Sequence, residues 1–435
     1  MKGLPVAAGI LIESCLLGIL ALGDLKLQMP LFFILFGIAH AAYLTVLWRS
    51  DAFSLRFVFA FGVLFRATLL LSDPSLSDDI YRYLWDGRVQ AAGINPYRYA
   101  PNASELAHLR ESSSFLRVNH PDLPTIYPPL AQALFRAGYG ISSTVWGIKA
   151  LLVGLDLVAG WFLVGLLRVY ALPPGRLLIY LWNPLLVVEV SGSGHIDMLG
   201  VAWMVFALFY LGMGGYGRAM GALACSVLSK FFAICLVPVF WRWICAAGPG
   251  QPAFRRLKAL LNCRKLWPVL VFGGIVGVGY LPYAGVGWQV FGSLPVYSEH
   301  WEFNALVFPA LQHVLGSGMG ARVCIVALFG GAVLVTALGH WPPIRVGCWV
   351  TGAFLLLTPT LHPWYAIWIL PFLVFYPRPA WLVFVGLVPL AYHVQIQYAR
   401  AGVWAEAPWV KGVIFGGMAL TWAAIWLWTR WRHRV

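Results

Sequence analysis

The interpretation of the whole chain depends on residues 77–97, which read SDDIYRYLWDGRVQAAGINPY. This stretch carries five formal charges within eleven residues and directly follows a run of apolar sequence. If residues 78–90 are helical, helical spacing places the polar side chains on one face, namely Asp79, Arg82, Tyr83, Asp86 and Gln90. Tyr81, Trp85 and Val89 form a second, apolar face. Such a helix is typical of a membrane surface, with aromatic rings at headgroup depth and carboxylates turned toward a cavity.

Two interpretations of this polar face are open. The first is functional, because carboxylates at the water end of a membrane span are frequent catalytic acids and bases. The second is structural, because a ladder of Asp and Arg pairs also solvates an interfacial helix. We favour the functional interpretation, since the charges are concentrated in a chain that carries few of them elsewhere.

Composition predicts an all-α polytopic membrane protein. The 435 residues are 60% hydrophobic and only 11% charged, which is far from the range of soluble globular proteins. The net charge of +14 mainly reports orientation, because many Lys and Arg residues fall in segments predicted to be cytoplasmic; it does not imply a nucleic-acid partner. The seven cysteines show neither metal-binding spacing nor a disulfide framework. We expect one integral domain over residues 1–435, with the first apolar run retained as a membrane span.

The order of apolar runs and basic loops predicts twelve crossings plus a hairpin, within a range of 11 to 13 spans. The runs lie at about 5–22, 30–48, 55–71, 145–168, 177–192, 197–213, 267–283, 321–338, 346–360, 364–376, 380–394 and 410–429. The positive-inside rule puts both termini in the cytoplasm and residues 72–144 outside, in the inner (plasma) membrane. That outer loop is longer than most loops that only connect two helices, which favours a functional role. Its segment PPLAQALFRAGYGI predicts an interfacial helix.

Residues 219–241 do not fit a plain crossing. Arg218 precedes this segment and the basic loop 242–265 follows it, so both ends are expected in the cytoplasm. We therefore predict two half-length helices that meet near Lys230, which membrane proteins tolerate where irregular backbone lines a cavity. A full span is the alternative.

Polar residues gather on the predicted outer side of the membrane. Ionisable groups at membrane depth are costly and point to function. They are Asp78, Asp79, Arg82 and Arg88; Glu189, His195 and Asp197; Glu299, His300 and Glu302; His362 and Tyr365; and His393 and Arg400. Asp78, Asp79, His195 and Asp197 are suitable ligand types for Mn or Mg, although their spacing is uninformative. The sequence has no glycine-rich phosphate loop, so a soluble nucleotide sugar has no evident binding site.

Several of these strings together resemble a known class. They are SDDIYRYLWDGRVQAAGINPYRYAP, IYPPL, GHID, SKFF, WEFN and LHPWY. They resemble the GT-C class of membrane glycosyltransferases, with bacterial polyprenyl-phosphate-mannose-dependent mannosyltransferases as the nearest fit. The strings run from about residue 77 to 365; the first is specific, and the others are short. The resemblance implies a GT-C-like helical bundle and an extracytoplasmic active site.

The resemblance also implies roles for individual residues. The acidic residue of the first large outer loop is the general base in such enzymes, and it matches Asp79 here, with Asp78 as its competitor. The adjacent pair departs from the Asp-x-Asp or Glu-x-Asp signatures of the class, so we expect neither a metal nor another cofactor.

The expected reaction is an inverting transfer of a sugar from a polyprenyl-phosphate donor to a hydroxyl of a lipid-linked or glycan acceptor, in contact with membrane lipid. The resemblance favours mannose as that sugar. Phosphate leaves without an acid but needs cations and hydrogen-bond donors around it. The candidates for donor-phosphate or substrate binding are Arg82, Arg88, Lys230, His195, Asp197, His362, Tyr365 and Arg400. The candidate sugar platforms are Trp85, Trp301 and Trp364. The main alternative is a transporter or flippase of a lipid-linked or ionic solute, and a non-catalytic assembly subunit is a third hypothesis.

Overall fold

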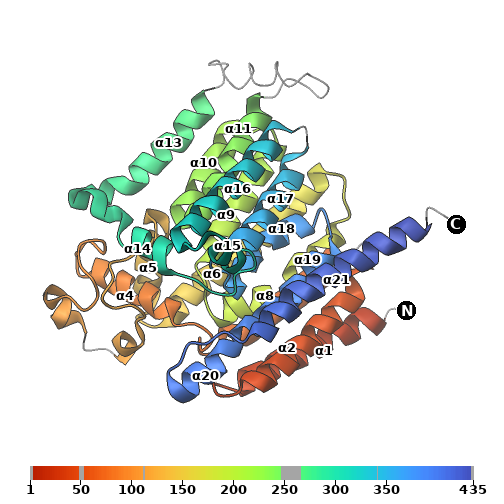
Figure 1. The fold of residues 1–435 in the computed structure, drawn as a ribbon, viewed down its shortest axis with the longest axis horizontal. Coiled ribbons are helices and arrows are strands. Elements are labelled where there is room, and N and C mark those ends of the chain that lie inside the picture. Colours follow the sequence, from red (N-terminus) through yellow and green to blue (C-terminus); the bar gives the residue numbers. More distant parts are fainter. Residues whose placement is uncertain (1–2, 49–52, 111–112, 246–265, 340, 433–435) are drawn as a thin grey trace.

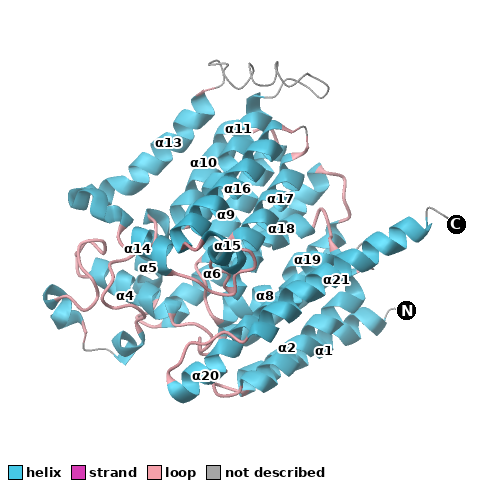
Figure 2. Ribbon diagram, in the orientation of Figure 1, coloured by secondary structure: helices cyan, strands magenta, loops and turns pink. Residues whose placement is uncertain are grey.

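The structure is a computed structural model that describes residues 3–48, 53–110, 113–245, 266–339 and 341–432. Within these ranges the protein is a helical bundle, and its only extended pairing is one isolated bridge between Phe303 and Thr360 (Figures 1 and 2). The all-α polytopic prediction is therefore confirmed. The predicted cytoplasmic loop 242–265 lies outside the described residues from position 246 onward.

The first part of the bundle ends at the outer-loop helices. It consists of α1 (Gly3–Ala21), α2 (Met29–Leu47), α3 (Leu55–Leu70), α4 (Asp79–Ala91), η2 (Ser104–Leu109), η3 (Ser113–Arg117) and α5 (Pro129–Ile141). The middle part consists of α6 (Val145–Val169), η4 (Pro174–Leu177), α7 (Leu178–Leu181), α8 (Pro184–Val187), η5 (Val188–Gly192), α9 (Asp197–Gly212), α10 (Tyr216–Ser229), η6 (Phe231–Leu236) and α11 (Val237–Cys245).

The last part begins after the gap. It consists of α13 (Trp267–Tyr280), η8 (Leu281–Phe291), α14 (Leu294–His300), α15 (Phe308–Leu315), α16 (Gly318–Leu338), α17 (Pro343–Leu357), η9 (Pro363–Ile369), α18 (Leu370–Leu373), α19 (Pro379–Leu387), η10 (Val388–His393), α20 (Val394–Ala401) and α21 (Pro408–Arg432).

Seven of the described segments are long and apolar enough to cross a membrane, by length and composition. They are residues 4–21, 29–47, 145–169, 267–300, 318–338, 379–401 and 408–431. Four shorter apolar helical segments accompany them, at residues 197–212, 231–245, 343–357 and 363–373. Each of these overlaps a run that the sequence predicts as a span or as part of the hairpin, but the segment 267–300 extends into residues that the sequence predicts as an outer loop, and the predicted spans 55–71 and 177–192 are not among them.

Two of the predicted spans are broken into short helical pieces. The run 177–192 is interrupted at Asn183, whose side chain accepts hydrogen bonds from the backbone N–H groups of Leu185 and Leu186 and so begins a new helix. The next turn, η5, is one turn of π-helix, a form that is frequent at functional sites. The run 364–376 begins as the 3₁₀ helix η9, with Pro363 at its start and Pro371 in the following α18.

Residues 216–245 form the predicted hairpin. The backbone of Lys230 is extended, with φ −154° and ψ 124°, and separates α10 from η6 and α11. At the far ends of the two arms, Gly217 packs against Trp267 at the start of α13, and Arg242 donates a hydrogen bond to the carbonyl of Trp341 just before α17. Figure 1 shows both arms rising to the same end of the bundle, which leaves Lys230 at the apex.

The outer loop is a packed layer and not a solvated helix. Helix α4 lies so close to α5 that a Cβ on Gly87 would clash with the carbonyl oxygen of Phe135. Most of the polar face of α4 is buried against α5, where Arg82 pairs with Asp86 at 3.1 Å and Gln132 donates to Asp86 at 2.9 Å. Beyond the first turn, the polar face of α4 is therefore not turned toward a cavity as expected, because α5 covers it.

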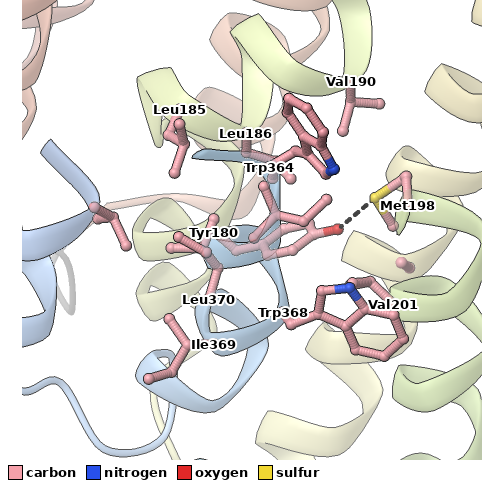
Figure 3. Packing of buried hydrophobic residues seen from close by; sticks show 14 of the residues in the cluster. Tyr180, Leu185, Leu186, Val190, Met198, Val201, Trp364, Trp368, Ile369 and Leu370 are labelled. Atoms are coloured by element: carbon pink, nitrogen blue, oxygen red, sulfur yellow. Dashed lines mark hydrogen bonds between the residues drawn. The ribbon is translucent and has the colours of Figure 1, made fainter. Parts of the chain in front are cut away.

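Below this layer lies a continuous apolar core with residues from α1 to α21. Figure 3 shows its centre, where Trp364 and Trp368 of η9 lie between the 180–190 segment and α9. The hydroxyl of Tyr180 donates to the sulfur of Met198 at 3.6 Å in this region. This rigid packing positions the side chains that α9 and η9 present to the outer layer.

Candidate active site

A cavity of about 770 Å³ lies where α4 begins, at the opposite end of the bundle from the far ends of the hairpin. Its walls come from segments distant in the sequence: the start of α4, the 119–128 loop, the start of α9, the apex of the hairpin, α14, and the 354–368 and 392–404 segments. Nine of the predicted site residues line it, namely Asp78, Asp79, Arg82, Asp197, Lys230, Trp301, His362, Trp364 and Tyr365.

Asp79 is the first residue of α4 and faces the cavity. Its Oδ1 accepts a hydrogen bond of 2.7 Å from the side-chain amide of Asn119, and its carboxylate has no ion pair with Lys or Arg among the described residues. The side chain keeps 23% of its surface accessible. Burial raises the pKa of Asp79 from 3.8 to about 6, although Lys230 and Asn119 oppose the shift. A carboxylate of this kind is ionised at neutral pH and is still a stronger base than an ordinary aspartate.

Asp78 has a different environment. Its two carboxylate oxygens lie 3.0 and 3.2 Å from Nζ of Lys26, which comes from the loop between α1 and α2. Its side chain is 34% accessible, more than that of Asp79. The cation holds this carboxylate toward the α1–α2 loop, whereas Asp79 has no Lys or Arg partner among the described residues.

Lys230 and Asp197 form the second charged group of the cavity. Nζ of Lys230 lies 2.9 Å from Oδ2 of Asp197, and Trp368 donates from its indole nitrogen to Oδ1 at 2.9 Å. Asp197 is buried, whereas Lys230 keeps 25% of its side chain accessible. Asp197 therefore anchors the lysine at the apex of the hairpin, and the remaining ammonium protons are free to meet an anion in the cavity.

The other polar side chains near the cavity include an arginine that donates hydrogen bonds, a pair of tyrosines and a histidine. Arg82 is nearly buried, and its guanidinium donates to Asp86 and, at 3.4 Å, to the carbonyl of His120. The hydroxyls of Tyr365 and Tyr297 lie 2.8 Å apart, which ties η9 to α14. Burial lowers the pKa of His120, so this residue is neutral at pH 7. The backbone of His120 has a φ of +44°, a strained conformation of the type found at functional sites.

Aromatic side chains line the outer part of the cavity. Trp301 is half-buried and meets the ring of His120 edge-on at 4.7 Å. Its carbonyl accepts a hydrogen bond from Thr360, next to the bridge in which the backbone of Phe303 donates to the carbonyl of Pro359 and accepts from the N–H of Leu361. Trp301 is thus a fixed ring with accessible surface. Trp364 is only 6% accessible, since it stacks on His195 at 3.8 Å and on His362 at 4.2 Å, so it offers little surface to a sugar.

Four predicted site residues do not line the cavity. Trp85 is buried on the other side of α4 against Phe115. Arg88 lies in the last turn of α4, away from Asp79, and Arg400 is exposed on α20. His195 is buried behind Asp79, where no ligand in the cavity reaches it directly. These placements follow from tertiary packing, which sequence spacing does not report.

Three residues that the sequence analysis did not single out belong to the site. Asn119 holds Asp79, Tyr297 holds Tyr365, and Trp404 lines the mouth of the cavity beside Phe303. Asn119 lies seven residues before the IYPPL string of the outer loop, and this proximity is the only sequence signal that points to it. Within the described ranges, no three His, Cys, Asp or Glu side chains are arranged to hold a metal ion, and the question of metal dependence stays a prediction.

Comparison with known proteins gives a consistent family assignment. Two curated relatives are both named alpha-(1->6)-mannopyranosyltransferase A. The one from Mycobacterium tuberculosis is 25% identical over 361 residues, which is 74% of this chain and 64% of the relative. The one from Corynebacterium glutamicum is 24% identical over 361 residues, which is 72% of this chain and 70% of the relative. The match thus spans slightly less than two thirds of the M. tuberculosis protein, and no solved structure matches the chain.

The match to a family model covers residues 11–247, which include α4, His195, Asp197 and Lys230. The family is described as alpha-(1->6)-mannopyranosyltransferase, N-terminal domain. These findings confirm the resemblance to GT-C mannosyltransferases. Since the matched segment is more than half of the chain, the protein belongs to this family.

Proposed function

We propose that the protein is an inverting mannosyltransferase of the membrane. It moves mannose from a polyprenyl-phosphate donor to a hydroxyl of a lipid-linked or glycan acceptor on the extracytoplasmic face. The family assignment and the names of the two relatives support mannose as the sugar, and they favour a transferase over a transporter or flippase.

The observation that carries the proposal is the state of Asp79. It is a carboxylate without an ion pair to Lys or Arg in the described chain, held by Asn119 at the wall of a large cavity, with a pKa raised to about 6. A base for a sugar hydroxyl needs these properties, because it must be ionised before the reaction and able to keep a proton during it. Asp78, Asp86 and Asp197 each have a Lys or Arg partner within 3.1 Å.

The proposed reaction is a single displacement. The acceptor oxygen attacks the anomeric carbon while its proton passes to Asp79. The bond from that carbon to the phosphate oxygen breaks, and the electron pair leaves with the lipid phosphate. Lys230 meets the phosphate charge at the apex of the hairpin, with His362 and Arg82 further along the cavity wall. Because attack and departure occur on opposite faces, an alpha-linked product, as in the names of the relatives, requires a beta-linked donor.

The location of the site supports a lipid-linked donor. The cavity lies in a bundle whose helices carry many exposed apolar side chains, among them Val278, Leu281 and Trp288 near α14. Arg242 lies near the end of the second hairpin arm and does not line the cavity, whereas residues 230–232 at the other end of that arm do. Because the positive-inside rule predicts that the basic loop after this arm is cytoplasmic, the arrangement supports an extracytoplasmic cavity. Trp301 is the remaining candidate platform for a sugar ring.

The direct test uses purified protein in lipid nanodiscs with total membrane lipids as acceptors. We expect label to move from polyprenyl-phosphate-mannose to a lipid or glycan product, and no label to move from GDP-mannose. Analysis of the purified product should show an alpha-mannosyl linkage from a beta-linked donor. Transfer from the nucleotide sugar alone, or retention of the donor configuration, would overturn the proposal.

A further inference from the structure

The hydroxyl groups of Tyr297 and Tyr365 form a pair in the wall of the cavity. Tyr297 comes from α14 in the outer layer, and Tyr365 comes from η9 in the bundle. Their oxygen atoms lie 2.8 Å apart, and both side chains line the cavity. The reaction steps at Asp79 and Lys230 do not use this pair.

Two hydroxyl groups carry two protons, and a hydrogen bond between them uses only one of these protons. The hydroxyl that accepts this bond keeps its own proton for a further acceptor. Among the described residues, neither oxygen makes another hydrogen bond. One O–H donor of the pair is therefore available to a ligand in the cavity.

Lys230 lies next to the same pair. Its Nζ is 5.2 Å from the centre of the Tyr365 ring. Its bond of 2.9 Å to Asp197 uses one of the three ammonium protons. An ammonium group and a hydroxyl group that line one cavity are two donors suited to the oxygens of one phosphate group.

The cavity wall beside the pair is apolar. The ring of Phe354 lies 6.0 Å from that of Tyr365 and 4.2 Å from that of Phe232, centre to centre. Phe231 lines the cavity in the same region of the chain. Hydrogen-bond donors with apolar rings beside them fit a phosphate that is esterified to a hydrocarbon chain, because the chain can cover the rings while the phosphate meets the donors.

We propose that Tyr365 binds the phosphate of the lipid donor together with Lys230, and that Tyr297 positions the Tyr365 hydroxyl. Tyr297 donates a hydrogen bond to Oη of Tyr365, and Tyr365 donates a hydrogen bond to a phosphate oxygen. No proton is transferred in either bond. The direction follows from the position of Tyr365, which is the member of the pair beside Lys230.

This phosphate site, formed by Lys230, Tyr365 and Tyr297, rests on the proposed function and deepens it. When the bond between the anomeric carbon and the phosphate oxygen breaks, the phosphate gains one negative charge. A preorganised donor stabilises this developing charge more than it stabilises the bound sugar donor. Loss of the Tyr365 hydroxyl should therefore slow the displacement and also weaken the binding of the free lipid phosphate.

The test uses Tyr365→Phe and Tyr297→Phe, which each remove one oxygen atom and keep the ring. The matched control is Tyr43→Phe, because the Tyr43 hydroxyl also donates a buried hydrogen bond, of 2.7 Å to the carbonyl of Ile179, and Tyr43 does not line the cavity. Each protein, in lipid nanodiscs, transfers sugar from labelled polyprenyl-phosphate-mannose. Polyprenyl phosphate and a polyprenol of the same chain length are added as inhibitors, since they differ only in the phosphate group.

We expect Tyr365→Phe to lower kcat by about a hundredfold and Tyr297→Phe to lower it by about tenfold. Each variant should raise the inhibition constant of polyprenyl phosphate at least about fivefold and leave the effect of polyprenol unchanged. The double variant should be no slower than Tyr365→Phe, because Tyr297 acts through Tyr365. Tyr43→Phe should keep the wild-type values.

Wild-type kcat and wild-type inhibition by polyprenyl phosphate in Tyr365→Phe would overturn the phosphate site. An equal change in inhibition by polyprenol would also overturn it, because it would indicate altered packing and not a lost phosphate contact. If the losses of the two single variants multiply in the double variant, the positioning role of Tyr297 is contradicted. If Tyr365→Phe does not fold, the same measurements on Tyr297→Phe decide.

Failure of the phosphate site is distinct from failure of the proposed function. If the wild-type protein transfers no sugar from the lipid donor, the proposed function is contradicted, and the phosphate site with it. If wild type is active, Asp79→Asn is inactive and both tyrosine variants behave as wild type, only the phosphate site is contradicted.

Discussion

Asp79 and Asp86 lie two turns apart on the same face of α4, yet their surroundings differ completely. Asp86 is 2% accessible, paired with Arg82 at 3.1 Å and held by Gln132 at 2.9 Å. Asp79 has an amide partner and no ion pair with Lys or Arg in the described ranges, and it lies at the wall of the cavity. The middle of α4 thus matches the structural interpretation of its charges, and for its first turn the functional interpretation stays a prediction.

Residues on the same polar face of a helix can therefore have different roles. Helix α5 covers α4 from the second turn onward, and there the charges pair to satisfy each other. Only the end of the helix that extends beyond this cover keeps an available carboxylate. Substitutions along this face should therefore separate loss of stability from loss of activity.

The largest effect on stability is expected from Asp86→Asn. This variant leaves the guanidinium of Arg82 buried without a counter-charge, and removal of one partner of a buried ion pair typically lowers stability by about 3–5 kcal/mol. We expect a much lower unfolding temperature in detergent and poor recovery of the protein. The double variant Arg82→Met with Asp86→Leu should recover part of that stability. If the Asp86→Asn protein were as stable as wild type, the structural role of the Arg82–Asp86 ion pair would be contradicted.

The pH dependence of the reaction should report Asp79. Because burial raises its pKa to about 6, the base is protonated and inactive below that pH. We expect kcat/KM to fall tenfold per pH unit below about 6, where an ordinary aspartate would keep the activity constant down to about pH 4. The measurement is initial rates of transfer between pH 4.5 and 8. An activity that is flat down to pH 5 would contradict the assignment.

Asp79→Asn should stabilise the fold at neutral pH. The folded-state pKa of about 6 lies above the ordinary value of 3.8, so folding disfavours the ionised form. Wild-type stability should fall as the pH rises from about 4 to 6, by on the order of 2 kcal/mol. Asparagine does not ionise, so the variant should unfold at a higher temperature than wild type at pH 8 and at the same temperature near pH 4. Equal stability at pH 8 would contradict the desolvated state of Asp79.

The smallest effect is expected where Asp78 meets Lys26. This pair is partly exposed, with side-chain accessibilities of 34% and 18%, and such pairs contribute about 0–1 kcal/mol. Lys26→Met should therefore change the unfolding temperature little and keep transfer within a few-fold of wild type. A loss of activity as large as that of Asp79→Asn would show that Asp78 and Lys26 take part in the chemistry.

Much of the architecture could be predicted from local sequence. The bounds of α4 and α5 agree within a residue or two with the predicted helices, because periodicity and a proline at the first turn are local signals. The hairpin at Lys230 was also predictable, since the charges on both sides of the segment require the same compartment.

The arrangement of the site could be predicted only in part. Asp79 and His362 were identified as membrane-edge polar groups and Lys230 as the meeting point of two half-length helices, and the fold brings them to one cavity. The partners that decide their roles are far away in sequence, such as Asn119 for Asp79, and spacing along one helix cannot reveal them. Trp85 and Arg88 are candidate site residues on the same helix as Asp79. The helical repeat points their side chains in other directions, toward other neighbours.

The most direct test of the account is sugar transfer by three variants of α4 measured side by side. Asp79→Asn, Asp78→Asn and Asp86→Asn would each be purified and assayed with labelled polyprenyl-phosphate-mannose, with activity expressed per folded molecule. We expect Asp79→Asn to lose at least about a hundredfold in kcat while it remains folded, and Asp78→Asn to stay within a few-fold of wild type. Full activity in Asp79→Asn, or the larger loss in Asp78→Asn, would contradict the assignment of Asp79 as the base.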